Sequence, residues 1–554
     1  MALWKLGSHF SSVILLLLLQ LWAHCCSHGA VGDPNIHVES VSVRVNGMQS
    51  IATVDESFIC GTIDWWPPQK CDYGSCSWGN TSILNLDLMN PILQNAVTEL
   101  SPLMIRLGGT LQDRVIYYVG NLQSSCGPLI PGSGLFGYTD GCLSMSRWQA
   151  LNEFFQKTRS VVAFGLNALN GRRRTGSTYS GAWDSSNAQE FIQYTYKQNY
   201  PIRAWELGNE LSIPGVGGSI SSPQYAADVN KLRAIVDETY KTSPVKPLIV
   251  APDGRFDASW YQQLLQVSGP KALDVCTRHI YNLGPGVDEN LVSKILNPFY
   301  LDKEAGYFKL VQQTLQRYGP WADAWVGEAG GAFNSGRDLV SNAFAFSFWY
   351  VDQLGMAAQF NNKVYCRQTL IGGNYGLLDT TSFHPNPDYY SALLWRKLMG
   401  RVVLSASLTR SPYIRAYAHC SKDDHKAIAV VLINLNNATH YDVDLALSIS
   451  SVGSTSLSRP MLDVSGILKD KMEAGDTLLS SGRLEYHLTA PNGDIHSRTV
   501  LLNGNALQVT LNNRIPVMAP IMADNMRPIT VAPLSIVFAV VSALDIPACS
   551  QTLV

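Results

Sequence analysis

Two short apolar stretches of the chain each end on a glutamate, and these glutamates are its strongest candidates for acid–base chemistry. The first stretch reads WELGNE and ends at Glu210, and the second reads AWVGE and ends at Glu328, 118 residues later. A strand that ends on a carboxylate places that group at the rim of a sheet, where a β/α barrel carries its catalytic residues. Two such carboxylates can break a glycosidic bond, because one protonates the leaving oxygen while the other attacks the anomeric carbon or activates water. We therefore expect Glu210 and Glu328 to meet at one rim.

The elements that would position this pair repeat along the first 400 residues. Amphipathic segments at residues 146–158, 222–242 and 342–354 predict helices between short apolar runs that end in polar or glycine residues. Eight such runs predict strands at residues 58–64, 103–107, 161–167, 202–207, 248–251, 273–281, 324–328 and 356–360. Eight strands alternating with helices predict an α/β protein built on a parallel (β/α)8 TIM barrel. No G-x-G-x-x-G loop or P-loop follows an early strand, which argues against a nucleotide-binding fold.

The pattern becomes all-β after an expected helix at residues 389–399. Runs at residues 413–419, 427–435, 441–447 and 507–511 predict strands of a smaller β-sandwich. An alternating run at residues 36–45 predicts an N-terminal strand that joins it. The last apolar stretch, residues 529–544, is interrupted by Pro533 and predicts a closing strand instead of a lipid anchor. We expect residues 30–50 to join the sandwich, 51–400 to form the barrel and 401–554 to form the sandwich itself.

The N-terminus has the features of a secretory signal. Lys5 precedes an apolar run at residues 13–19, which is too short to cross a membrane, and small or polar residues follow. We expect residues 1–29 to be a signal peptide and the protein to be secreted, to the extracellular space or apoplast, with a vacuole or lysosome-like compartment left open. The sequons at Asn80 and Asn437 then predict glycosylation sites.

The composition limits the classes of partner that the chain is expected to bind. A net charge of −2 with 15% charged residues leaves no basic field for nucleic acid, and no transmembrane span is predicted. No CxxC pair or His/Cys cluster has zinc spacing, so neither a metal nor a cofactor is indicated; the oligomeric state stays open. Of 11 cysteines, two would leave with the signal. Nine is an odd number, which predicts that at least one cysteine is free or paired between chains, while Cys126 and Cys142 are a plausible local pair.

The glutamate stretches resemble two motifs of the heparanase and β-glucuronidase family, glycoside hydrolase family 79. WELGNE resembles the acid/base motif and WVGE the nucleophile motif. Further similar segments follow in order from about residue 58 to residue 549: IRLGGT at 105–110, FGLNAL at 164–169, GGNY at 372–375 and NPDYY at 386–390. The DWWPP and GEAGGAFNSG segments are most similar to the plant heparanase-like and baicalin β-glucuronidase branch of that family.

The resemblance implies a retaining mechanism with Glu210 as general acid/base and Glu328 as nucleophile. It also implies that a tyrosine, here Tyr375, and the backbone amides of Asn334 and Ser335 hold the carboxylate of a uronic acid. The family has glycines where this chain has Asn334 and Ser335. Other positions that the resemblance implicates are the sugar-contacting Asp64, Thr110, Asn209 and Tyr281, the last beside the nucleophile, and a disulfide between Cys420 and Cys549.

Several alternatives stay open. The excisable segment of heparanase has no counterpart in the short stretch from about Val115 to Arg147, and basic clusters for a sulfated glycan are not evident, so we expect a single-chain, exo-acting glucuronidase. Its expected substrates are glucuronic acid on cell-wall arabinogalactan or small-molecule glucuronides. An endo-acting, heparanase-like enzyme and a non-catalytic glycan-binding protein are the alternatives. His279 could orient a site group or be structural. We expect Glu206 to be scaffold. The basic run at 172–174 could contact a glycan, but a solvated loop is favoured.

Overall fold

The computed structural model describes residues 37–120, 126–213, 217–448, 462–463, 482–542 and 546–550, and it contains a closed barrel of eight parallel strands. Neighbouring strands follow the chain order, and the last strand pairs with the first. The barrel strands are β2 Ile59–Ile63, β3 Met104–Leu107, β6 Val161–Leu166, β9 Ala204–Leu207, β10 Leu248–Ala251, β11 Val275–Ile280, β13 Asp323–Ala329 and β15 Asn362–Arg367. The predicted (β/α)8 barrel is confirmed.

The eighth strand is the one that the sequence placed wrongly. Residues 356–360, predicted as a strand, belong to helix α10 (Phe344–Gln359), and the strand is β15, which follows it. Every residue of α10 up to Ala358 is buried, so the helix has no polar face that would reveal its period. The true strand begins on Asn362 and Lys363 and ends on Arg367, which makes its apolar run short.

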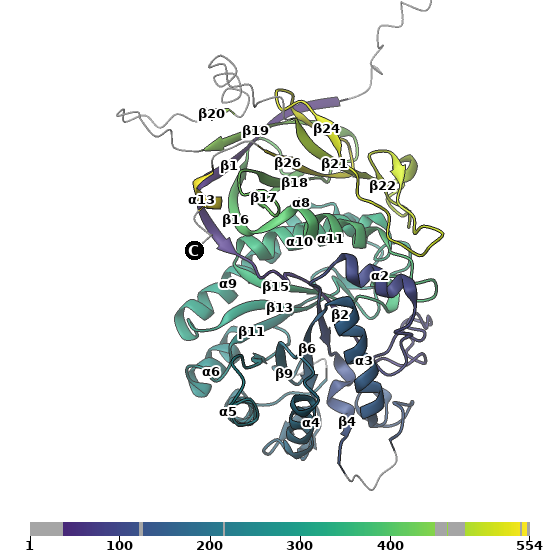
Figure 1. The fold of residues 1–554 in the computed structure, drawn as a ribbon, viewed down its shortest axis with the longest axis vertical. Coiled ribbons are helices and arrows are strands. Elements are labelled where there is room, and N and C mark those ends of the chain that lie inside the picture. The colour runs from purple at the N-terminus through teal and green to yellow at the C-terminus, as the bar shows by residue number, and fades with distance from the viewer. Residues whose placement is uncertain are drawn as a thin grey trace, which may run out of the picture.

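Helices cover the outside of the barrel between the strands (Figure 1). Local sequence explains where they begin: the Asn90 side chain caps the first helix by accepting from the amides of Ile92 and Leu93, and Asp257 caps another by accepting from Trp260. The longer helices are α2 Pro91–Glu99, α3 Met145–Thr158, α4 Ser186–Lys197, α5 Ser222–Thr239, α6 Ala258–Ser268, α9 Lys303–Tyr318, α10 and α11 Pro387–Leu398.

A second, mixed sheet lies at the end of the molecule beyond α10 and α11 (Figure 1). Its core is β1 His37–Thr53, β16 Met399–Leu408, β17 Ile414–Ser421, β18 Ile428–Asn434, β19 Thr439–Ser448, β21 Arg483–Thr489 and β26 Ser535–Val541. β1 runs antiparallel to β16 and parallel to β19, so the N-terminal strand joins the C-terminal sheet as predicted. β1 continues to Thr53 and β16 begins at Met399, close to the boundaries expected for the smaller unit.

Two strand predictions in this sheet need correction or refinement. Residues 507–511 form no strand. Leu507 is buried and its amide donates to Val500, but Leu511 is fully exposed and the segment pairs with no strand of the described residues. The only strand beside it is the two-residue β23, Asn505–Ala506. The closing stretch at 529–544 forms two strands, β25 Ile529–Val531 and β26, separated around Pro533, which has no amide hydrogen for a ladder.

Helix α10 joins the two parts through a buried polar contact. Asp352 on α10 is fully buried and accepts hydrogen bonds from Arg415 Nε at 2.7 Å and from the Tyr417 hydroxyl at 2.6 Å, both from β17. Gly355, one turn further, leaves room for the Tyr417 ring, which a Cβ there would meet at 2.2 Å. Close packing at Gly355 and the buried polar contacts of Asp352 therefore both hold the sheet against the barrel.

Four disulfides form among the described cysteines, and Cys276 is free and buried. The predicted Cys420–Cys549 and Cys126–Cys142 bonds are confirmed, and the other two are Cys60–Cys366 and Cys71–Cys76. The expected signal segment lies outside the described residues. Within the described part of the chain, no helix has the length and apolar character that crossing a membrane requires.

Candidate active site

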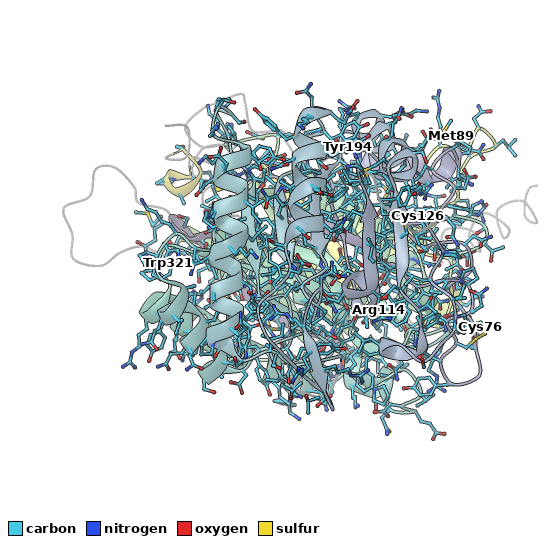
Figure 2. The ribbon with its side chains drawn as sticks, turned by 90° about the horizontal axis from the view of Figure 1, so that it is seen from below. Cys76, Met89, Arg114, Cys126, Tyr194 and Trp321 are labelled. Atoms are coloured by element: carbon cyan, nitrogen blue, oxygen red, sulfur yellow. A yellow bond between two sulfur atoms is a disulfide. The ribbon has the colours of Figure 1, made fainter. Side chains whose placement is uncertain are left out.

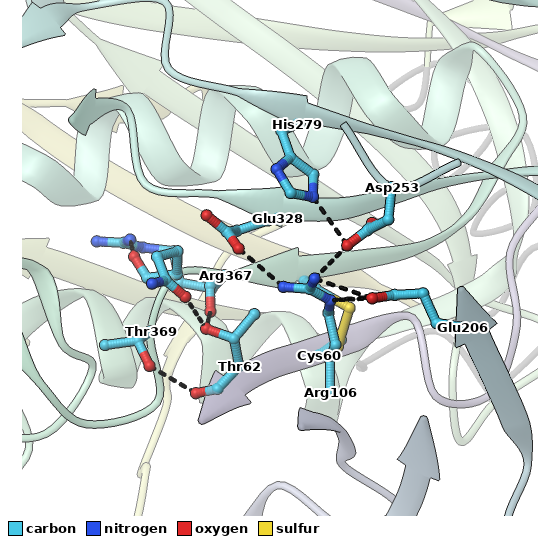
Figure 3. Close-up of a disulfide and its surroundings, with 11 residues drawn as sticks. Cys60, Thr62, Arg106, Glu206, Asp253, His279, Glu328, Arg367 and Thr369 are labelled. Atoms are coloured by element: carbon cyan, nitrogen blue, oxygen red, sulfur yellow. Dashed lines mark hydrogen bonds and ion pairs between the residues drawn. A yellow bond between two sulfur atoms is a disulfide. The ribbon is translucent and has the colours of Figure 1, made fainter. Parts of the chain in front are cut away.

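Arg106 lies at the centre of the carboxyl end of the barrel and links side chains from several strands (Figure 3). Its guanidinium is 1% exposed. Nη1 donates to Glu328 at 2.8 Å, Nη2 donates to Glu206 and to Asn209 at 2.9 Å each, and Nη2 also donates to Asp253. An arginine suits this place because its rigid, permanently charged fork can serve several carboxylates at once.

Glu328, on the seventh barrel strand, is held through both of its carboxylate oxygens. Oε2 accepts from Arg106 and Oε1 accepts from the hydroxyl of Tyr281, the residue that follows β11. The expected contact between Tyr281 and the nucleophile candidate is thus present. Burial, followed by the negative charge of Glu328, raises the pKa of Tyr281 well above its ordinary value, so the phenol keeps the proton that it donates.

Glu210 follows the fourth strand, and its carboxyl group contacts His279. The backbone turns sharply there: Glu210 has φ of 55°, and Gly254 packs so closely that a Cβ on it would meet the Glu210 Cα at 3.1 Å. Oε1 lies 2.9 Å from His279 Nδ1, and the other ring nitrogen, Nε2, lies 2.9 Å from Asp253 Oδ2. His279 therefore contacts a candidate site group, and its orienting role stays a prediction.

The pKa values in this cluster follow from burial and from charge. Burial alone would lower the pKa of His279, but the negative charges of Asp253 and Glu328 outweigh it and raise that pKa well above 6.5. Burial likewise would raise the pKa of Asp253, but Arg106 and His279 hold it below its ordinary value. His279 thus lies between two carboxyl groups, 2.9 Å from each, and can fix the orientation of the Glu210 carboxyl group.

A β-bulge places His279, which contacts Glu210, directly beside Glu328. The pairing of β11 with β13 shifts between Arg278 and His279, so that His279 stands opposite Glu328 and Gly327 is passed over. A Cβ at Gly327 would meet Asp253 Oδ1 at 1.8 Å. The glycine before the nucleophile candidate therefore makes room for the Asp253 carboxylate.

Both glutamates open into one cavity of about 750 Å³ at this rim. All but one of the residues expected from the sequence line it: Asp64, Thr110, Glu210, Tyr281, Glu328, Asn334, Ser335 and Tyr375. Asn209 is the exception, because it is not among the residues that line the cavity. It is buried, its backbone amide donates to Asp113, and its side chain accepts from Arg106. Binding roles for these residues stay predictions, but their convergence is a feature of the fold.

Asp64 is the lining residue with the most clearly perturbed carboxyl group. Burial, together with the negative charge of Glu328, raises its pKa from 3.8 to about 7. The backbone amide of Trp65 and the side-chain amide of Gln368 donate hydrogen bonds to it at 2.6 and 3.0 Å. These bonds oppose the rise in pKa but do not cancel it. Asp64 therefore holds a proton in mildly acidic solution and loses it near neutrality.

One wall of the cavity offers neutral hydrogen-bond donors. In the described part of the chain, the backbone amides of Asn334 and Ser335 donate to no protein acceptor, although Ser335 is only 3% exposed. Tyr375 lies beside them on the loop after β15, where the amide of the preceding Asn374 donates to the Ser335 carbonyl at 2.7 Å, and burial raises the pKa of its phenol well above its ordinary value. Such amides and a phenol can bind a carboxylate by charge-assisted hydrogen bonds.

The basic run at 172–174 lies elsewhere and is partly structural. The Arg172 side chain is fully buried and donates to Asp228 at 2.5 Å, whereas Arg173 and Arg174 are exposed on a small hairpin. None of the three lines the cavity. Glu206, expected to be scaffold, is 1% exposed and bonded to Arg106.

Sequence reasoning missed Arg106 and Asp253 as parts of the site. A signal existed for each: Arg106 is the only charged residue in its apolar strand, and Asp253 follows a strand end two residues after Ala251. It also missed Lys70, Asp72 and Trp78, which reach the cavity from a loop without strand periodicity. Loop residues of this kind carry no periodic pattern that would reveal their direction.

Comparison with known proteins places this geometry in context. The model of "Glycosyl hydrolase family 79, N-terminal domain" matches residues 40–355. The chain is 48% identical to heparanase-like protein 3 of Arabidopsis thaliana over 97% of its own length and 99% of that relative's. It is 40% identical to baicalin-β-D-glucuronidase of Scutellaria baicalensis, over 92% and 93% of the two chains. A solved 4-O-α-L-rhamnosyl-β-D-glucuronidase from Fusarium oxysporum shares the fold, with a TM-score of 0.61, 14% identity, and coverage of 90% of this chain and 100% of the other.

Proposed function

The chain belongs to glycosyl hydrolase family 79 and is a glycoside hydrolase, and from that premise we propose that it is a secreted, retaining, exo-acting β-glucuronidase. One observation carries the proposal: the two candidate glutamates share a cavity that is also lined by a phenol and by two backbone amides that have no protein acceptor in the described part of the chain. The glutamates supply the chemistry of glycoside cleavage, and the neutral donors supply a site for a sugar carboxylate.

The mechanism has two displacements. In the first, Glu328 attacks the anomeric carbon while Glu210 protonates the departing glycosidic oxygen, which gives a glycosyl-enzyme ester and the free aglycone. In the second, Glu210 removes a proton from water, which attacks the anomeric carbon and releases Glu328 and the β-sugar. Arg106 and Tyr281 hold Glu328 in its attacking orientation, and His279 holds Glu210.

Recognition of the sugar would use the donor wall. The uronic acid carboxylate accepts from the amides of Asn334 and Ser335 and from the hydroxyl of Tyr375, while Asp64 and Thr110 serve the ring hydroxyls. Asn209, which was expected to contact the sugar, accepts from Arg106 instead. A glucoside lacks the carboxylate that these donors serve. We therefore infer a preference for glucuronides.

The charges of the cavity support a substrate with one carboxylate over a sulfated polyanion. Three cationic residues besides His279 line it, but Lys70 is paired with Asp72 at 2.7 Å and Arg278 with Glu304 at 2.6 Å, leaving Arg255. Five carboxyl groups line the same space: Asp64, Asp72, Glu210, Glu304 and Glu328. This balance supports glucuronic acid at the end of a cell-wall glycan such as arabinogalactan, or a small-molecule glucuronide.

Secretion is part of the proposal. Four disulfides among the described cysteines fit an oxidising compartment, and the sequon residues Asn80 and Asn437 are both exposed. Expression of the full chain in plant cells with a peptide-N-glycosidase digest tests this part. We expect a mass loss at both sites and an N-terminus near residue 30; a retained leader without glycans would contradict it.

Removal of the nucleophile tests the chemistry. Glu328→Gln should lower kcat/KM for an aryl β-glucuronide by on the order of 10³-fold or more, because no glycosyl ester can form. Glu190→Gln, an exposed glutamate on α4, is the control and should keep wild-type activity. Ordinary turnover by the Glu328 variant would contradict the assignment.

Leaving-group dependence tests Glu210. Glu210→Gln should slow an alkyl glucuronide far more than a 4-nitrophenyl glucuronide, because a nitrophenolate needs little protonation to leave. Proton NMR of the first product should show the β-anomer. Equal losses on the two substrates, or the α-anomer appearing first, would contradict the acid role and retention respectively.

Carboxylate recognition is tested at Tyr375. Tyr375→Phe should raise KM for a β-glucuronide by about tenfold, the effect of one lost charge-assisted hydrogen bond, and leave the KM of the matching glucoside nearly unchanged. An equal effect on both substrates would remove Tyr375 from carboxylate binding.

A further inference from the structure

The turn at Asn334 and Ser335 has a backbone conformation that residues with side chains rarely adopt. Asn334 has φ of 57° and Ser335 has φ of 67°, both in the left-handed region. Asparagine tolerates that region better than most residues, but serine does not, and two such residues in succession are unusual. Something outside the turn must hold it, because the backbone alone does not favour it.

Three side chains from one distant loop contact the turn. The Ser335 hydroxyl donates to Asp72 and accepts from Trp78 Nε1 at 2.9 Å, and Asn334 Nδ2 donates to the Tyr73 hydroxyl at 2.9 Å. The loop is about 260 residues earlier in the chain than the turn. Both side chains of the turn are therefore bonded to residues 72–78.

The loop is stapled by a short disulfide. Cys71 and Cys76 are five residues apart, and the bond encloses Asp72 and Tyr73. Asp72 and Ser75 exchange backbone hydrogen bonds at 2.9 Å inside it. Both cysteines are exposed, and Cys76 lies at the edge of the molecule in Figure 2. A disulfide on the surface that buries no core has its structural effect on the few residues that it encloses.

The same loop also reaches Tyr375, the third donor of the cavity wall. The Trp78 ring packs edge-on against the Tyr375 ring at 6.1 Å between centroids, and Trp78 is 1% exposed. Lys70 Nζ lies 2.7 Å from Asp72 and 4.6 Å from the centre of the Trp66 ring. Lys70 thereby offsets the negative charge of Asp72, which would otherwise repel an anion bound at the neighbouring amides.

We propose that residues 70–78, closed by the Cys71–Cys76 disulfide, are a positioning clamp that holds the Asn334–Ser335 amides and Tyr375 for a sugar carboxylate. This rests on the proposed β-glucuronidase function. The clamp sets which sugar binds and leaves the catalytic glutamates untouched, since the described hydrogen bonds and ring contacts of residues 70–78 reach Asn334, Ser335 and Tyr375 but neither Glu210 nor Glu328. Reduction of this surface disulfide would loosen glucuronide binding without stopping the chemistry.

The first test removes the staple. Cys71→Ser/Cys76→Ser should raise KM for an aryl β-glucuronide by about tenfold, as for one lost charge-assisted hydrogen bond, with kcat and the glucoside KM nearly unchanged. Cys420→Ala/Cys549→Ala is the control, because it removes a disulfide of the second sheet; it should lower Tm and leave the ratio of the two KM values unchanged. A wild-type KM ratio in the Cys71/Cys76 variant would overturn the proposal.

The second test asks whether the staple acts through the turn. In an Asn334→Gly/Ser335→Gly background the positive φ angles cost little and no side chain reaches the loop. Removing the Cys71–Cys76 bond in that background should raise the glucuronide KM by much less than in the wild-type background, because only the Trp78–Tyr375 ring contact then connects the loop to the donors. The same increase in both backgrounds would show that the loop acts elsewhere and would overturn the clamp.

A third measurement is independent of substrate. Hydrogen–deuterium exchange of peptides covering residues 330–337 should be faster in the Cys71→Ser/Cys76→Ser variant than in the wild type. A wild-type protein without glucuronide activity would end the proposed function, and faster exchange would still support the clamp. An active wild type with unchanged exchange in the variant would end the clamp alone.

Discussion

At the scale of single residues, the site depends on a few buried charges that the barrel strands deliver to one point. Arg106 bonds to Glu328, Glu206 and Asp253, and His279 joins Asp253 to Glu210. Removing one member of such a network leaves its buried neighbours with one partner fewer and an uncompensated charge. The two glutamates could be found from sequence, because each ends a strand. Arg106 was harder to assign, because only the barrel brings residue 106 beside residue 328.

The ionisation of Asp64 predicts a pH dependence of binding. Its pKa is about 7, so it is neutral at pH 5 and negative at pH 8, beside Glu328 and beside the proposed uronic acid. We expect KM for a β-glucuronide to rise between pH 6 and 8 in the wild type. Asp64→Asn keeps this position neutral at every pH, so its KM should vary less over the same range. A parallel rise in the variant would assign the effect to another group.

The same group predicts a change in stability. A folded pKa raised from 3.8 to about 7 contributes stability that is fully present at low pH and is lost as pH rises to about 7. Asp64→Asn has no such loss. The difference in Tm between variant and wild type should therefore shift in favour of the variant from pH 5 to pH 8, as followed by circular dichroism; a constant difference would contradict the raised pKa.

At the scale of elements, the barrel closes between its first and last strands, and there Cys60 of β2 is bonded to Cys366 of β15. The two residues are 306 positions apart and directly paired in register. The sequence showed an odd number of cysteines but not this pairing, because the eighth strand was placed at residues 356–360. A fully buried helix and a buried strand look alike as apolar runs. The first seven strands could be located because each ends on a polar or glycine residue.

Removal of this bond should loosen barrel closure. Cys60→Ala/Cys366→Ala should lower the free energy of unfolding by roughly 2–5 kcal/mol, since the bond restricts a long loop in the unfolded chain. Neither cysteine lines the cavity, so kcat at 20 °C should be nearly unchanged. Denaturant unfolding and initial rates measure the two quantities. Unchanged stability would mean that strand pairing alone closes the barrel.

At the scale of the whole molecule, we expect the barrel and the second sheet to unfold as one unit. β1 leads from the sheet directly to the first barrel strand, and α10 lies between the barrel strands and the sheet (Figure 1). Asp352 of α10 accepts hydrogen bonds from Arg415 and Tyr417 of the sheet. The alternating runs predicted this sheet and its N-terminal strand. They wrongly predicted a strand at residues 507–511, where the apolar residues lie in a segment that pairs with no strand of the described chain.

Loss of the contact between the parts should destabilise the entire chain. Asp352→Ala leaves the Arg415 guanidinium without its fully buried partner, and we expect a loss of about 3–5 kcal/mol in the free energy of unfolding. Tyr417→Phe removes one hydrogen bond and should cost about 1 kcal/mol. A single cooperative transition at lower denaturant is expected for both variants. Two separate transitions would contradict one folding unit.

The central claim is that Glu328 forms a covalent bond with a glucuronic acid residue. Incubation of the purified protein with a 2-deoxy-2-fluoro-β-glucuronyl fluoride slows the second displacement and should accumulate that intermediate, which peptide mass spectrometry locates. We predict a single added fluoroglucuronyl group on the peptide that contains Glu328, and none on the Glu328→Gln variant. A label on another carboxylate, or release of fluoride without any labelled peptide, would contradict the account.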